Sequence, residues 1–143
     1  MTDGITEMME RADLCGVSIG LIGSCSAIDK VRKCQPISDK EKESLRYAGQ
    51  FWGAVDWDQD EQIRETGFSE PLATTLRPIF YEAIFEEKIV SLADIRARRR
   101  VYDFLTSGDA SNITIGELEG SCKLLRYVHE SVLSSLQLGS GEI

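Results

Sequence analysis

The chain is 143 residues long, 42% hydrophobic and 28% charged, with a formal net charge of −8. This is the composition of a globular protein, and the length fits a single domain. No uninterrupted apolar run approaches the ~20 residues of a membrane-spanning helix, and the negative charge disfavours nucleic-acid binding by the surface as a whole.

Residues 1–7 include acidic side chains where a secretory signal would be basic. The four cysteines show no C-x-x-C spacing, and a chain of this length does not need disulfides to hold its core. We therefore expect a cytoplasmic protein without a membrane segment, whose cysteines are reduced thiols.

Two apolar stripes run along residues 5–28 at the three- and four-residue spacing of an α-helix. A helix that is apolar on two faces is expected at the centre of a fold, and its glycines would let another helix approach closely. Because each glycine costs about 1 kcal/mol inside a helix, a break near Gly16 is left open. The first stripe is Ile5, Met8, Ala12, Cys15, Ile19 and Ile22; the second is Leu14, Val17, Leu21, Cys25 and Ile28; the glycines are Gly16, Gly20 and Gly23.

Residues 38–55 predict a second helix, because Ser38 and Glu41 form a capping box ahead of an apolar stripe. Asp58 and Glu61 can begin a short helix that Gly67 would end. Ser69-Glu-Pro then predicts another helix start.

Pro78 falls inside the apolar segment 72–89. Proline removes an amide donor and clashes with the preceding turn, so two half-helices are predicted there. Residues 92–106, which follow Ser91 and precede Gly108, predict a further helix.

The longest apolar stripe lies in residues 114–138, where Thr114 and Glu117 form a capping box and Gly139 is a predicted helix stop. The stripe contains Ile115, Leu118, Cys122, Leu125, His129, Val132 and Leu136. We predict an all-α fold, a single-domain bundle of five or six helices over residues 1–138 with the first and last helices central, followed by a flexible tail at 139–143.

An acidic segment at residues 39–65 is the first candidate binding surface. Its acidic turn contains Asp56, Asp58, Asp60 and Glu61. Trp52 and Trp57 beside it are predicted aromatic anchors for a partner protein with a basic surface if either ring is exposed. The aspartates match the first half of a calcium-binding EF-hand loop, but Glu61 stands where that loop needs glycine and Gly67 where it needs glutamate. An acidic turn is therefore favoured over a calcium site.

Arginines are concentrated in Arg96-Ala-Arg-Arg-Arg100, and guanidinium groups suit phosphates or carboxylates. Four arginines in five helical residues cannot all point one way, and Arg96, Arg99 and Arg100 are predicted to share a face. They can bind nucleic acid or an acidic partner, or they can pair with nearby acidic side chains. Those side chains are Asp94, Asp103, Glu86 and Glu87.

His129 is the sole histidine and lies two helical turns from Cys122. Together with Cys15 they could form a metal or redox site, but no chelating pair of residues is present, so a core histidine is the default interpretation. No catalytic, cofactor or metal motif is recognised elsewhere.

The spacing of Arg99–Leu105, then Ile115, Leu118, Cys122, Leu124, Val128, Leu133, Leu136, Gly139 and Ile143, loosely resembles a winged-helix DNA-binding domain. Lys123 replaces the turn glycine of that pattern and Glu119 replaces a small residue. The resemblance implies a recognition helix that offers Arg126 and His129 to DNA. A single unbroken helix explains the same apolar positions with one element.

From these observations the sequence indicates a non-catalytic protein-interaction module, such as an adaptor, an inhibitor or a small assembly subunit. One alternative is a nucleic-acid-associated helical protein, winged-helix-like or part of a ribonucleoprotein, that uses Arg96–Arg100. The other alternative is a small metal- or redox-responsive protein.

Overall fold

The computed structural model describes the backbone of residues 3–59 and 68–141 and the side chains of residues 13–59 and 68–136. The described chain is all helical and contains no strand, so the prediction of an all-α fold is confirmed. The helices are α1 (Asp3–Arg32), α2 (Asp39–Val55), α3 (Glu70–Phe85), the short 3-10 helix η2 (Val90–Leu92), α4 (Ile95–Ser107) and α5 (Ile115–Gly141).

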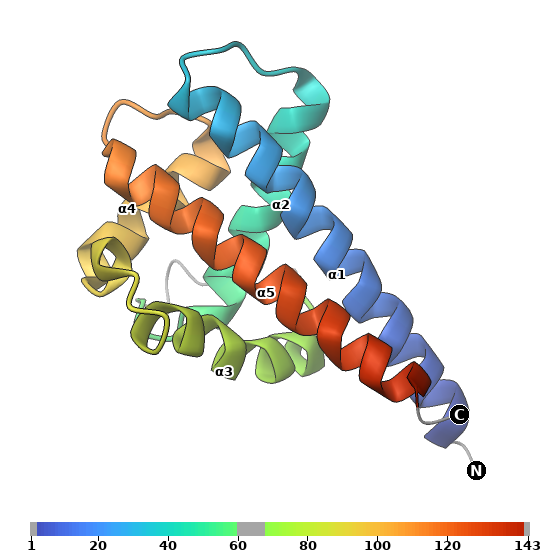
Figure 1. The fold of residues 1–143 in the computed structure, drawn as a ribbon. Coiled ribbons are helices and arrows are strands. Elements are labelled where there is room, and N and C mark those ends of the chain that lie inside the picture. The colour runs from blue at the N-terminus through green and yellow to red at the C-terminus, as the bar shows by residue number, and fades with distance from the viewer. Residues whose placement is uncertain (1–2, 60–67, 142–143) are drawn as a thin grey trace.

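The first and last helices form an antiparallel pair, as Figure 1 shows. They share the most extensive contact of any two helices, and both extend beyond the others, so the N-terminal end of α1 lies beside the C-terminal end of α5. At the other end, α2 packs on α1, while α3, η2 and α4 pack on α5. The predicted central position of α5 is therefore confirmed, and α1 is its main partner.

The pairing register of α1 and α5 follows from two polar contacts. Ser18 meets His129 and Cys25 meets Cys122. Seven residues separate the two members on each helix, so the contacts repeat with the heptad spacing of paired helices.

Only one of the two apolar stripes of α1 faces the core. Val17, Leu21, Cys25 and Ile28 are buried, whereas Ile19 is 64% exposed and Cys15 is also exposed. The expectation that α1 is buried on two faces is therefore wrong for residues 13–28, because only one side of the helix is covered by α5 and α2. Ile5, Met8 and Ala12 lie outside the described side chains.

The glycines of α1 do not break the helix, which is continuous from Asp3 to Arg32. Close approach is confirmed at Gly20, where an added Cβ would collide with the ring of Tyr47 in α2. At Gly16 an added Cβ would meet nothing within 4 Å, and at Gly23 its nearest contact would be an ordinary one. One glycine of the three therefore serves the packing.

The stretch Asp13–Arg32 of α1 has a mean hydropathy of 1.4 and is long and apolar enough, by length and composition, to cross a membrane. In the fold, 39% of this stretch is buried within the protein. Core helices of soluble proteins meet the same two criteria, so the finding does not separate a core helix from a membrane span.

The helix ends follow the predicted local chemistry. Ser38 and Glu41 form the capping box of α2, and Thr114 and Glu117 form that of α5. Gly108 ends α4 in the left-handed conformation with φ of 76°. Gly139 does not end α5, however, because the helix continues to Gly141.

Proline does not divide α3, which is continuous from Glu70 to Phe85 with Pro78 inside it. The prediction of two half-helices is therefore wrong. Pro78 and Thr74, whose carbonyl loses its helical partner, both lie on the exposed side of the helix, where water can satisfy that carbonyl. Of the short helix predicted between Asp58 and Gly67, residues 60–67 lie outside the described residues.

The winged-helix interpretation requires two helices and a β wing where α5 stands. Instead α5 is one helix from Ile115 to Gly141, and residues 99–141 contain no strand. That interpretation is therefore wrong, and Arg126 and His129 lie on a helix that packs along α1.

Candidate functional site

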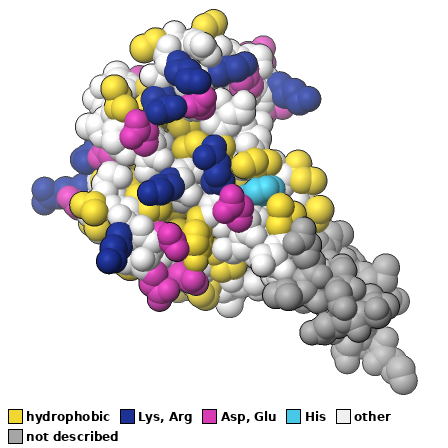
Figure 2. All heavy atoms as spheres, in the orientation of Figure 1, with side chains coloured by type: hydrophobic (Ala, Val, Ile, Leu, Met, Phe, Trp, Pro, Cys, Tyr) yellow, Lys and Arg dark blue, Asp and Glu magenta, His cyan; other side chains and the backbone are white. Residues whose placement is uncertain are grey.

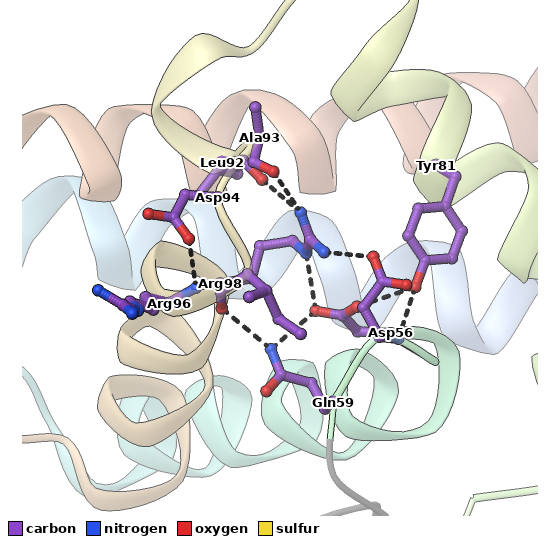
Figure 3. A network of polar contacts seen from close by, with 10 residues as sticks. Asp56, Gln59, Tyr81, Leu92, Ala93, Asp94, Arg96 and Arg98 are labelled. Atoms are coloured by element: carbon purple, nitrogen blue, oxygen red, sulfur yellow. Dashed lines mark hydrogen bonds and ion pairs between the residues drawn. The ribbon is translucent and has the colours of Figure 1, made fainter.

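A buried ion pair joins the end of α2 to α4 (Figure 3). The side chains of Arg98 and Asp56 are 1% and 0% exposed, and Nε of Arg98 donates to Oδ2 of Asp56 over 3.0 Å. The remaining guanidinium nitrogens donate to Oδ2 of Asp58 over 2.5 Å and to the carbonyl oxygens of Leu92 and Ala93 over 2.7 and 3.1 Å. Every nitrogen of this guanidinium therefore has an acceptor, which a buried charge requires.

Two further side chains complete the network around Asp56 (Figure 3). The hydroxyl of Tyr81 donates to Oδ1 of Asp56 over 2.9 Å, and it accepts the backbone N–H of Asp58 over 3.1 Å. Burial and the charge of Asp56 raise the pKa of Tyr81, so the hydroxyl remains a donor. Gln59 donates to Oδ2 of Asp56 over 3.1 Å and to the carbonyl oxygen of Ile95 over 3.4 Å.

This network accounts for part of the predicted acidic surface. Asp56 is internal and neutralised by Arg98, so it is not available to a partner protein or to a calcium ion. Asp58 keeps about half of its side chain exposed but also binds Arg98. Asp60 and Glu61 lie outside the described residues.

The two predicted aromatic anchors differ in position. Trp52 is fully buried and packs edge-to-face on Phe80 with ring centroids 5.1 Å apart, so it cannot be a surface anchor. Trp57 is 44% exposed, but the guanidinium of Arg77 lies 3.8 Å above its ring and its Nε1 donates to the carbonyl oxygen of Ala54. Of the pair, only Trp57 reaches the surface.

The arginine side chains of α4 point to different sides of the helix, as helix geometry requires. Arg98 points into the buried network, while Arg96 points away from it (Figure 3). Arg96, Arg99 and Arg100 line one open pocket of about 460 Å³ together with Ile95 and Gln59. We call these five residues the arginine face.

Among the residues that the structure describes, the charge of the arginine face is only partly compensated. Arg100 pairs with Glu117 of α5, with Nη2 to Oε2 at 2.5 Å, and this contact raises the pKa of Arg100. Burial opposes ionisation of Glu117, but hydrogen bonds from Arg100 and Thr114 hold its pKa below the usual value. Arg96 and Arg99 are exposed. The face thus presents guanidinium groups around Ile95, which is 39% exposed.

The sole histidine belongs to the contact between α1 and α5. Nδ1 of His129 lies 2.5 Å from Oγ of Ser18 and 3.0 Å from the carbonyl oxygen of Ser18. Ser18 is fully buried, so no substrate reaches its hydroxyl, and the pair is a helix–helix contact rather than a nucleophile and base. His129 is half-buried and reaches the surface among hydrophobic side chains (Figure 2), so it is less enclosed than a core histidine.

The predicted combination of Cys15, Cys122 and His129 does not form a site. Cys15 is exposed, and Cys122 meets Cys25 instead, across the interface of α1 and α5. Among the side chains that the structure describes, no group of three His, Cys, Asp or Glu residues is placed to hold a metal ion.

Sequence reasoning missed the roles of Cys25, Ile95, Gln59 and Tyr81. One signal was present for Cys25, because Ser18 and Cys25 have the same seven-residue spacing as His129 and Cys122. The other three are brought to their sites by contacts between distant elements, which local spacing does not report.

No family model, curated protein or solved structure matches this chain, so the arginine face must be interpreted from its geometry.

Proposed function

We propose that the protein is a non-catalytic interaction module whose arginine face binds an acidic segment of another protein. The observation that carries this proposal is the division of the arginines, with Arg98 internal and three guanidinium groups lining one open pocket. Because the buried Asp56 and Trp52 weaken the acidic segment as a binding surface, the arginine face is the better candidate.

The chemistry of the pocket favours carboxylates over a neutral ligand. A guanidinium group presents parallel N–H donors that match the two oxygens of a carboxylate. Arg96 and Arg99 are exposed on α4, whereas Arg100, one turn from Arg96, is held by Glu117, so two carboxylates along one peptide segment can be bound at once.

Two features favour a protein segment over nucleic acid. The net charge of −8 repels a polyanion at long range, whereas a short peptide carries fewer charges. Ile95 lies exposed within the arginine face and offers a contact to an apolar side chain, which a phosphate backbone does not have. An acidic segment with one apolar residue fits both features.

Fluorescence anisotropy with a labelled peptide of aspartate and glutamate around one leucine tests the proposal. We expect binding by the wild-type protein, at least ~10-fold weaker binding by Arg96→Gln/Arg99→Gln, which corresponds to ~1.4 kcal/mol, and weaker binding of a peptide with serine in place of leucine. The matched control is Lys42→Gln/Arg46→Gln, which removes two exposed charges from α2 and should leave the affinity unchanged.

Three results would overturn the proposal. These are equal affinity of the wild-type and Arg96→Gln/Arg99→Gln proteins, displacement of the peptide by single-stranded or duplex DNA at lower concentration than by unlabelled peptide, and binding of a lysine-rich peptide in preference to the acidic one. The last result would favour the acidic surface and a basic partner.

A further inference from the structure

Two cysteines from distant parts of the chain meet where α1 packs on α5. Sγ of Cys25 lies 3.5 Å from the carbonyl oxygen of Cys122, and Sγ of Cys122 lies 3.8 Å from the carbonyl oxygen of Cys25. The two cysteines therefore contact each other reciprocally across the helix interface. Cys25 is 3% exposed, whereas Cys122 is half-buried, so only Cys122 can be reached from solvent.

Cys122 opens into a pocket of about 430 Å³ that is formed by α1 and α5. Charged side chains from both helices surround the sulfur. Arg32 pairs with Asp29 over 2.6 Å and with Glu119 over 3.2 Å, and Nη2 of Arg126 lies 3.8 Å from Sγ of Cys122. With Lys123 added, the lining has three cations and two carboxylates, so its net charge of +1 balances a thiolate at Cys122.

The surroundings shift the pKa values of the two thiols in opposite directions. The hydrogen bond from Cys25 and the charges of Arg126 and Arg32 outweigh burial and lower the pKa of Cys122 to about 7. The hydrogen bond to Cys122 and burial raise the pKa of Cys25. Near neutral pH, Cys25 is therefore a thiol, and its S–H donates to the carbonyl oxygen of Cys122.

We propose that Cys122 is a site of thiol–disulfide exchange with a low-molecular-weight disulfide that carries carboxylates, and that Cys25 then converts the mixed disulfide into an internal one. The cations of the pocket attract the carboxylates, the half-buried sulfur of Cys122 reacts first, and the buried sulfur of Cys25 lies beside it. The site is separate from the arginine face and does not depend on the proposed function.

Both steps balance with the named oxidant. The Cys122 thiolate attacks one sulfur of the small disulfide; a new S–S bond forms, the old one breaks, and one small thiolate leaves. The sulfur of Cys25 then attacks Sγ of Cys122, its proton passes to the departing second thiolate, and the internal disulfide forms. Two protein thiols are oxidised in total, and one small disulfide is reduced to two thiols.

Mass spectrometry of the protein after incubation with oxidised glutathione tests this sequence. The exposed Cys15 and Cys34 are first replaced, so the starting protein is Cys15→Ser/Cys34→Ser. We expect that protein to lose the mass of two hydrogen atoms and to keep no adduct. Adding Cys25→Ser should leave one glutathione attached at Cys122, and adding Cys122→Ser or Cys122→Ala should abolish both products.

The pH dependence of alkylation by iodoacetamide tests the role of the pocket. We expect the rate at Cys122 to reach half its maximum near pH 7, and Arg126→Gln to move that midpoint upward. Arg46→Gln, which removes the same charge from the exposed side of α2, should leave the midpoint in place. Circular dichroism of each variant checks that the helices remain formed.

The proposal is overturned if the Cys15→Ser/Cys34→Ser protein keeps both thiols under oxidised glutathione, or if Cys122→Ser reacts as readily as Cys25→Ser. It is also overturned if the Arg126→Gln and Arg46→Gln proteins share the alkylation midpoint of the parent.

Discussion

Arg98 is one of the largest fully buried side chains of the protein, and its guanidinium charge is balanced by the equally buried Asp56. Neither group is stable there alone, because a buried charge without a partner costs several kcal/mol. The pair joins the end of α2 to the turn before α4, and Tyr81 adds α3 to the same network. The network around this ion pair therefore links α2, α3 and α4.

Replacing Arg98 with methionine should destabilise the protein by about 3–5 kcal/mol, because Asp56 would remain buried without its counter-charge. Urea unfolding followed by circular dichroism measures the change. Arg96→Met is the matched control, since it removes the same charge from the exposed side of the same helix and should change stability by no more than ~0.5 kcal/mol. Equal midpoints for the two variants would contradict a stabilising role for the ion pair.

At this scale the sequence predicts only part of the site. Successive residues of an α-helix differ by about 100°, so Arg98 must face away from Arg96 and Arg100. Which side faces inward depends on Asp56, which is 42 residues away and comes from another element. The sequence likewise leaves open whether Trp52 is exposed as an anchor, because its apolar stripe does not reveal how completely Phe80 and its neighbours cover the ring.

Among the helices, the boundaries set by local chemistry were the most predictable. Capping boxes at Ser38 and Thr114 and the left-handed Gly108 are confirmed, because each is determined within a few residues. The errors at Pro78 and in the faces of α1 depend on which side of a helix meets solvent. The side of a helix that meets solvent is set by how the helices pack together, and the sequence of one helix alone does not reveal it.

Gly120 marks a close approach between α5 and the segment at η2. An added Cβ would collide with Oγ of Ser91 and would lie 3.1 and 3.3 Å from side-chain atoms of Ile89 and Leu92. We expect Gly120→Ala to cost about 1–3 kcal/mol, because the Ser91 side chain must move and the buried Ile89 and Leu92 cannot move without strain.

Gly116, one turn earlier in α5, provides the control for this substitution. An added Cβ there has its nearest neighbour at 3.9 Å, so Gly116→Ala should leave stability unchanged or raise it by up to ~1 kcal/mol. Thermal unfolding of both variants measures the difference. A Gly120→Ala protein as stable as Gly116→Ala would contradict the close packing of α5 on η2.

Over the whole molecule, the pair of α1 and α5 connects the first quarter of the chain to the last. Its contact at Cys25 and Cys122 spans 97 residues of sequence. A covalent link at this point closes about two thirds of the 143-residue chain into a loop, which restricts the unfolded chain strongly.

The internally oxidised protein should therefore unfold at a higher guanidinium concentration than the reduced one. The chain-entropy model gives an increase of about 4–5 kcal/mol for a loop of this length. The measurement compares oxidised and reduced Cys15→Ser/Cys34→Ser protein, with Cys25→Ser treated in the same way as the control. An unchanged midpoint, with the internal disulfide verified by mass, would show that the bond strains the helix pair.

The antiparallel arrangement of α1 and α5 also determines how the protein can be held on a solid support. Their outer ends lie together, on the side of the molecule away from α4 (Figure 1). Coupling the chain to a biosensor chip through either end would leave the pocket around Ile95 directed toward the flowing solution. Coupling through surface lysines would give a mixture of orientations, and the difference between the two signals would report which side of the molecule a binder occupies.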